Sequence, residues 1–279
     1  MTDPLDRRLY DQISALCGRV PVDRLRVTNR NAVLMYHSVR PAADCRPGTS
    51  DVAVAEFRRQ LDYLTSHHEV VDLPAVRESG GRGGGKKVAL TFDDGYRDFY
   101  TNVRPLLHEY DVPATVFVVA GFVDDADRRT QVANTGHLFD TLTSDQLADL
   151  ADDSLVSIGN HSRTHHDLGR HEDREIIRDE VEGARRDLED RFGVTVKRFC
   201  YPRGGHNAVS REIVRDSHAL ATVDESQRPL LGPEDRVRLP RIDAGLPFPL
   251  VRFRLSDANG ALMRLLGRGP TEPPAASNP

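Results

Sequence analysis

Short apolar runs recur along most of this chain, and each is separated from the next by a stretch with helical periodicity. The runs are continuous rather than alternating with polar residues, so both faces of each strand must be buried. Buried strands that alternate with helices indicate an α/β fold built on a parallel sheet. The predicted strands are 32–36, 69–72, 87–92, 114–119, 155–158, 198–201, 219–223 and 236–239, and the predicted helices are 53–66, 98–110, 143–151, 171–192 and 208–217.

The charge balance and the cysteines exclude several classes of protein. Acidic side chains number 43 and basic ones 38, which gives a formal net charge of −5. Nucleic-acid binding needs a concentrated basic surface, so we expect no nucleic-acid partner. The three cysteines are an odd number without C-x-x-C spacing, which argues against a disulfide framework and against a cysteine zinc site.

The N-terminal segment differs from the rest of the chain. Residues 5–30 combine an amphipathic helical pattern with a basic stretch, which predicts a helix packed on the domain or a weak contact with a membrane surface. The segment lacks the apolar core of a secretory signal peptide, and no run approaches the roughly 18 apolar residues that span a bilayer. We therefore expect a cytoplasmic protein, either free or held peripherally at the inner membrane face.

Two adjacent carboxylates follow the strand predicted at 87–92. Asp93 and Asp94 stand before Gly95, and active sites of parallel sheets gather at the carboxyl ends of their strands. Neighbouring carboxylates point in different directions there, so one can coordinate a metal while the other stays free as a base. Taken alone, this pair is equally typical of a turn that caps the next helix.

A histidine-rich segment follows the strand predicted at 155–158. His161 and His165 are four residues apart, a spacing that lets two imidazoles converge on one ion. Together with a carboxylate from 93–94 they form a facial ligand set with open positions. Such a set suits Zn²⁺ or another divalent metal, and a solvated loop is the alternative interpretation.

Two further clusters also stand at strand ends. Residues 199–205 read Phe-Cys-Tyr-Pro-Arg-Gly-Gly, and their Pro and Gly residues fix an irregular backbone whose N–H groups could enter a cavity. Residues 35–38 read Met-Tyr-His-Ser and end the first strand of the domain. Each cluster is weak evidence by itself, since the first is a common turn composition and a lone histidine is more often structural.

Together and in this order, the four clusters resemble the polysaccharide deacetylase family, also called the NodB-homology or carbohydrate esterase family 4 domain. Residues 91–95 (TFDDG) match its first motif, 161–165 (HSRTH) match its second, and 201–205 (YPRGG) stand where its third lies. The resemblance covers roughly 31–245, and VLMYHSV at 33–39 resembles the branch of poly-N-acetylglucosamine type. It implies an irregular (β/α) barrel of about seven parallel strands.

The resemblance also implies a role for individual residues. Asp93 would be the general base that takes a proton from the attacking water, and His37 the general acid of the branch with the early Tyr-His motif. The backbone N–H of Arg203 would help to bind the oxyanion. The implied metal is Zn²⁺, with Co²⁺ or Ni²⁺ as alternatives. The implied metal ligands are Asp94, His161 and His165.

Two motifs depart from the commoner pattern of the family. The third motif usually reads Arg-x-Pro-Tyr-Gly, but Cys200 stands at the arginine position and Arg203 at the tyrosine position. The arginine that would orient the base must therefore come from elsewhere, and Arg241 and Arg163 are the candidates. The late Leu-x-His motif is also missing, because residues 239–243 read Leu-Pro-Arg-Ile-Asp.

These observations predict a metal-dependent hydrolase that removes acetyl groups from an N-acetylated sugar in a polysaccharide or a surface-glycan precursor. A carbohydrate O-acetyl esterase and a catalytically weak glycan-binding homologue are the alternatives, and the oligomeric state stays open. We expect an amphipathic helix and basic linker at 1–30, a deacetylase domain at 31–255, and a C-terminal extension with a Pro-rich tail at 256–279. The aromatic residues that flank the predicted site are Tyr36, Tyr96, Phe99 and Tyr201.

Overall fold

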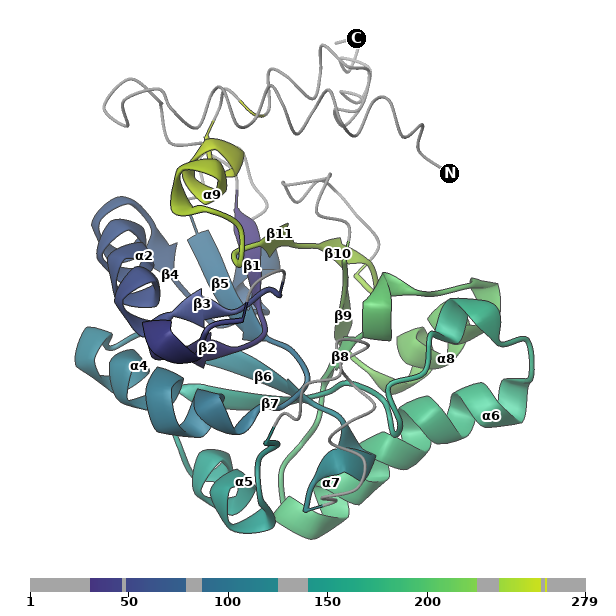
Figure 1. The fold of residues 1–279 in the computed structure, drawn as a ribbon. Coiled ribbons are helices and arrows are strands. Elements are labelled where there is room, and N and C mark those ends of the chain that lie inside the picture. The colour runs from purple at the N-terminus through teal and green to yellow at the C-terminus, as the bar shows by residue number, and fades with distance from the viewer. Residues whose placement is uncertain are drawn as a thin grey trace, which may run out of the picture.

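A parallel sheet that curls into a nearly closed barrel forms the centre of the molecule (Figure 1). The structure is a computed structural model that describes residues 31–46, 49–78, 87–124, 140–224, 236–256 and 259. The strands of the barrel are β1 (Ala32–Tyr36), β4 (Glu69–Val70), β5 (Lys87–Phe92), β6 (Ala114–Val118), β7 (Val156–Asn160), β8 (Arg198–Cys200), β9 (Leu220–Val223), β10 (Leu239–Pro240) and β11 (Ile242–Asp243).

Eight of these strands are hydrogen-bonded in the order β10-β9-β8-β7-β6-β5-β1-β11, and β4 pairs with the start of β5. Every pairing is parallel. Every residue of β1, β6 and β9 is buried, as the continuous apolar runs require when both faces of a sheet are covered. The α/β barrel expected from the sequence is therefore confirmed.

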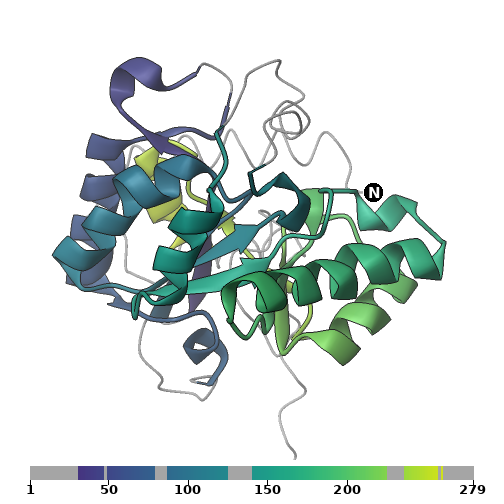
Figure 2. The ribbon, with the colours of Figure 1, turned by 90° about the horizontal axis from the view of Figure 1, so that it is seen from below.

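Helices cover the outside of the barrel, and those of the N-terminal half gather on one side of it while the green helices of residues 174–217 gather on the other (Figure 2). Local capping explains several of their ends, because Thr143 and Asn207 each form a capping box at a helix start. The helices are α2 (Val54–His67), α3 (Ala75–Glu78), α4 (Arg104–Tyr110), α5 (Ser144–Ala151), α6 (Arg174–Arg178), α7 (Ala184–Phe192), α8 (Ala208–Ser217) and α9 (Phe248–Arg254).

Shorter turns complete these elements. A short π-helical segment (π-turn below), η3 (Phe99–Val103), precedes α4. A second one, η7 (Asp179–Gly183), joins α6 to α7. Both lie inside helices that the sequence predicts as continuous. The remaining turns and strands are η2 (Ala42–Asp44), η4 (Ala120–Phe122), η6 (Leu168–Arg170), η8 (Pro202–Gly204), β2 (Val39–Arg40) and β3 (Val52–Ala53), the last two forming a separate two-stranded sheet.

The barrel is closed by one short segment that touches both edges of the sheet. β10 pairs with β9, with Leu239 opposite Thr222, whereas β11 pairs with β1, with Ile242 opposite Leu34. The strand predicted at 236–239 is wrong in its extent, because the chain is extended there only from Leu239 and then bends across the gap. Arg241 is the residue between the two strands, and its side chain is 1% exposed.

The sequence predicts separate segments at both ends of the chain, at 1–30 and 256–279. Residues 1–30, with the membrane contact predicted for 5–30, lie outside the described residues, as does nearly all of the extension at 256–279. Within the described part, no helix is long and apolar enough to cross a membrane. Cys45 and Cys200 are free thiols.

Candidate active site

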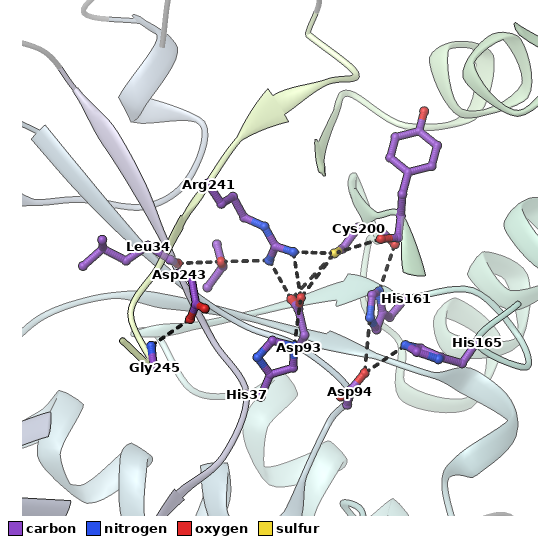
Figure 3. A network of polar contacts seen from close by, with 12 residues as sticks. Leu34, His37, Asp93, Asp94, His161, His165, Cys200, Arg241, Asp243 and Gly245 are labelled. Atoms are coloured by element: carbon purple, nitrogen blue, oxygen red, sulfur yellow. Dashed lines mark hydrogen bonds and ion pairs between the residues drawn. The ribbon is translucent and has the colours of Figure 1, made fainter. Parts of the chain in front are cut away.

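The sequence clusters meet at the carboxyl end of the barrel. The register places Tyr36, the last residue of β1, opposite Phe92, the last of β5, and places Asn160 opposite Phe199. The residues that directly follow these strands therefore lie together at the same end of the barrel. Figure 3 shows the side chains that converge there, and they come from the ends of β1, β5, β7 and β8 and from the closing segment. The site is therefore assembled by the topology of the barrel rather than by any single motif.

Three of the predicted residues form a compact donor set. The Nε2 atoms of His161 and His165 lie 3.3 and 3.2 Å from Asp94 Oδ1. The ligand atoms of the three residues all lie within 4.8 Å of one another. Asp94 and His161 are buried, and the side chain of His165 is 10% exposed. The triad predicted from the sequence is thus brought together, with one side open.

The hydrogen bonds of this set show that it fits a cation. His161 Nδ1 lies 2.9 Å from the backbone oxygen of Cys200, which can only accept, so Nδ1 donates to it and the other ring nitrogen, Nε2, faces Asp94. Asp94 Oδ1 is buried, and among the described residues no donor gives it a hydrogen bond of good geometry. A carboxylate oxygen and a deprotonated imidazole nitrogen are both acceptors, so a divalent cation between them would satisfy both.

The backbone of the site is held in unusual conformations. Of the six non-glycine residues with positive φ in the described part of the chain, four belong to the predicted motifs. A left-handed conformation costs such residues about 1–2 kcal/mol each, so it persists only where surrounding contacts enforce it. The four are Asp94 (φ 70°), Ser162 (φ 67°), His165 (φ 62°) and Arg203 (φ 58°).

Asp93 is held by a buried arginine from the closing segment. Arg241 Nη1 and Nη2 each lie 2.7 Å from one oxygen of the Asp93 carboxylate. Nη1 also lies 3.2 Å from the Thr91 hydroxyl, and Nη2 lies 3.1 Å from Cys200 Sγ. Burial by itself would raise the pKa of Asp93, but the guanidinium, together with two nearby imidazoles, outweighs burial and the pKa is lowered. Asp93 is therefore an oriented, ionised carboxylate.

The same pair decides between the two arginines proposed from the sequence. Arg163 instead places its Nε 2.9 Å from Asp179 and also pairs with Asp187, on the outer helix. Arg241 is the one that reaches the carboxylate, and it does so next to Cys200, where the family pattern has its arginine. The sequence identifies Arg241 only as one of two candidates. It reaches the site because the segment between β10 and β11 crosses the gap in the barrel.

The geometry also separates the roles of the two adjacent carboxylates. Asp93, His161 and Cys200 form a second group whose ligand atoms lie within 4.8 Å of one another. Arg241 already occupies both oxygens of Asp93 and contacts the thiol, so the positive charge of this second group is supplied by the guanidinium. The set that includes Asp94 has no such occupant among the described residues, which makes it the candidate cation site.

His37 lies on the other side of Asp93 from Arg241 (Figure 3). Its Nε2 is 4.0 Å from Asp93 Oδ2, too far for a hydrogen bond, and its side chain is 29% exposed. The loop after it is fixed by Asp98, which accepts from Ser38 Oγ at 2.6 Å and from Val39 N at 3.1 Å. Asp98 carried no signal in the sequence, because its partners lie about sixty positions away.

Arg203 is less closely joined to the site, and the flanking aromatic residues lie beneath its surface. Arg203 lies in η8 with an exposed side chain, and no contact recorded for the described residues links it to the triad, so its role stays a prediction. All four flanking aromatic side chains are buried, so they offer no exposed ring face on which a glycan could stack. Their exposed fractions are Tyr36 0%, Tyr96 4%, Phe99 1% and Tyr201 0%.

Comparisons with known proteins agree with the fold and the motifs. A family model described as polysaccharide deacetylase matches residues 80–220. The poly-β-1,6-N-acetyl-D-glucosamine N-deacetylase of Escherichia coli K12 is 32% identical over 148 residues, which cover 50% of this chain and 21% of that protein. The enzyme of the same name from Staphylococcus aureus MRSA252 is 22% identical over 216 residues, covering 72% of this chain and 69% of that protein.

A solved structure extends this similarity to the backbone. IcaB from Ammonifex degensii superposes with a TM-score of 0.66 at 23% identity, and the match covers 82% of this chain and 97% of that one. At this identity the likeness shows the fold alone. The chain spans only about a fifth of the E. coli relative, so the activity of that whole protein is not transferred with the match. The family model, however, covers just over half of the chain, and with these motifs and this fold the chain belongs to the polysaccharide deacetylase family.

Proposed function

We propose that this protein is a metal-dependent N-deacetylase that releases acetate and a free amine from an N-acetylated sugar of a polysaccharide or a surface-glycan precursor. The observation that carries the proposal is the pairing, at one barrel mouth, of a three-residue cation site with a separate, arginine-held carboxylate. The names of the E. coli and S. aureus relatives support an amide of N-acetylglucosamine over an O-acetyl ester as the substrate.

Asp94, His161 and His165 would hold the cation, for which we propose Zn²⁺, with Co²⁺ or Ni²⁺ as alternatives. A cation held by three protein ligands keeps open positions, and when bound it polarises a carbonyl and lowers the pKa of water. The chain contributes a ligand geometry that is set before binding, since the Cys200 carbonyl orients one imidazole. The left-handed conformations of Asp94 and His165 orient the other two ligands.

Asp93 would accept the proton from the water that attacks the acetyl carbonyl carbon. It is ionised because Arg241 lowers its pKa against the effect of burial, and it cannot swing toward the cation while both of its oxygens are bonded to the guanidinium. Arg241 thus positions the base and keeps it available.

Cleavage of the carbon–nitrogen bond also needs a proton on the departing nitrogen. We assign this donation to His37, whose Nε2 is not hydrogen-bonded to Asp93 and whose ring is partly exposed at the mouth. The backbone N–H of Arg203 is proposed to stabilise the oxyanion. One proton passes to Asp93 and one leaves His37, so attack and cleavage together balance.

Acetate release tests the overall proposal. Because attack depends on a bound cation, we expect acetate from N-acetylglucosamine oligomers, loss of release after a chelator, and recovery when Zn²⁺, Co²⁺ or Ni²⁺ is returned. A matched panel of O-acetylated sugars runs in parallel. Release from the esters alone would replace the proposal by an esterase, and release from neither set with any of the metals would leave a glycan-binding homologue.

Exchange of each carboxylate for its amide tests the division of roles. Asp94→Asn should lose the bound metal because a charged ligand is removed. Asp93→Asn should keep the metal and lose about 10²–10⁴-fold in turnover, the range for a general base. Metal content by elemental analysis and acetate release are measured on both proteins. Equal metal loss in the two variants, or full activity in both, would contradict the assignment.

Replacement of Arg241 by lysine tests how the base is positioned. Lysine keeps the charge but loses the two-pronged contact, so the pKa of Asp93 should rise. Because the base must be ionised, the acid limb of the kcat/KM profile should then move to higher pH, with unchanged metal content. Arg198→Lys is the control, since Arg198 pairs with Asp72 at the start of β8, away from the site. An unmoved limb in Arg241→Lys would remove Arg241 from this role.

Removal of the His37 imidazole tests the general acid. His37→Ala should lower kcat by about 10²–10⁴-fold, because the amine would leave without a positioned proton. Metal content should be unaffected, since the imidazole lies outside the donor set of the cation site. A substrate whose leaving group needs no proton should be hydrolysed by the variant almost as fast as by the wild type. Near-normal turnover of the amide substrate would exclude His37.

A further inference from the structure

The loop that carries both histidines of the cation site has a strained backbone. Ser162 and His165 adopt left-handed conformations with φ of 67° and 62°. A strained conformation of this kind is stable only when surrounding contacts enforce it. The contacts that hold residues 161–165 therefore decide where the second imidazole lies relative to Asp94.

The backbone amides of this loop are all accounted for. Three of those in 161–165 donate within the sheet or the loop itself. Their acceptors are Val118 O, Asn160 Oδ1 and Ser162 Oγ, at 2.8, 2.9 and 3.0 Å. The other two, from Arg163 and Thr164, both donate to Glu180 Oε2, at 3.1 and 2.9 Å, and the Arg163 amide is shared with the backbone oxygen of Glu180 at 3.1 Å. The Glu180 carboxylate thus accepts from both amides in the middle of the loop, and Thr164 N has it as its acceptor.

The helix on the outside of the barrel positions the Glu180 carboxylate next to the loop amides. It lies in the π-turn η7 between α6 and α7, and it is 4% exposed. Its second oxygen accepts from the Thr164 hydroxyl, and His166 Nδ1 lies 3.4 Å away. A π-turn within a helix frequently marks a functional position, and here it turns a buried carboxylate toward the loop.

The same π-turn receives the side chain of the loop. Arg163 pairs with Asp179 and Asp187 across the helix. A Cβ atom at Gly183 would stand 2.5 Å from Arg163 Nη2 and 2.4 Å from Asp179 Oδ1. A side chain at 183 would therefore push the ends of Arg163 and Asp179 aside. The helix thus contacts the loop both at its backbone and at the Arg163 side chain.

We propose that Glu180 is a positioning residue of the cation site, which acts by fixing the backbone of residues 163–164 so that His161 and His165 face Asp94. The inference rests on the proposed function, since it takes these two histidines as ligands. Among the described residues, Glu180 forms no hydrogen bond or ion pair with either ligand imidazole, so its effect passes through the loop. The sequence had marked this region only as part of a helix.

Cobalt binding to the metal-free full-length protein tests the proposal without an activity assay. Glu180→Gln replaces one acceptor oxygen by a donor that opposes the loop amides, so the dissociation constant of Co²⁺ should rise by about 10–100-fold, as for other outer partners of metal ligands. The visible absorption spectrum of bound Co²⁺ should change as well. Glu182→Gln is the matched control, because Glu182 lies on the same turn and pairs with Arg186 near the surface.

The outcomes separate this inference from the proposed function. A wild-type protein that binds no Co²⁺ would refute the proposed function. Wild-type affinity and spectrum in Glu180→Gln would overturn the inference alone, and so would equal destabilisation of metal-free and loaded protein with an unchanged dissociation constant. If Glu180→Gln fails to fold, Thr164→Val and Gly183→Ala take its place, and we expect a several-fold weaker affinity for each. Unchanged affinity in both would overturn the inference.

Discussion

The buried ion pair between Arg241 and Asp93 joins the closure of the barrel to the chemistry at its mouth. Two charges in the interior are costly unless their geometry is good and their remaining hydrogen-bonding groups are satisfied. Here two contacts of 2.7 Å meet the carboxylate, and Thr91 takes a further guanidinium contact. Loss of either partner would strand a buried charge, so the position of the closing segment and the position of the base are fixed together.

This pair also explains how the chain departs from its family's usual third motif without losing an arginine at the site. Arg241 enters from the seam between β10 and β11, and its Nη2 lies 3.1 Å from Cys200 Sγ. A small side chain at 200 leaves the guanidinium room beside Asp93. A guanidinium therefore stands beside Asp93 as in the family, although it is supplied by Arg241 and not by position 200. This weakens the case for a catalytically inactive homologue.

The site depends on a second layer of polar residues that face it from outside. Asp98 fixes the loop after His37, and Glu180 fixes the loop between the two histidines. Neither residue stands out in the sequence, because each lies within a helical stretch where an acidic side chain is ordinarily solvated. Only the packing of the helices against the strand ends shows that Glu180 is buried, that Asp98 is largely buried, and that both carboxylates accept hydrogen bonds from the loops.

Local patterns determined much of this protein. The apolar runs located most of the strands, and the spacing within 161–165 indicated that His161 and His165 join a carboxylate from 93–94, since both signals depend on residues close together in the chain. The resemblance of the motifs to the family then assigned Asp94 to the donor set. Three features were decided only by the tertiary structure. They are the choice of Arg241 over Arg163, the burial of the flanking aromatic residues, and the support from Glu180. Each depends on how the barrel closes and how its helices pack, which brings together residues that can stand as many as 148 positions apart, as Asp93 and Arg241 do.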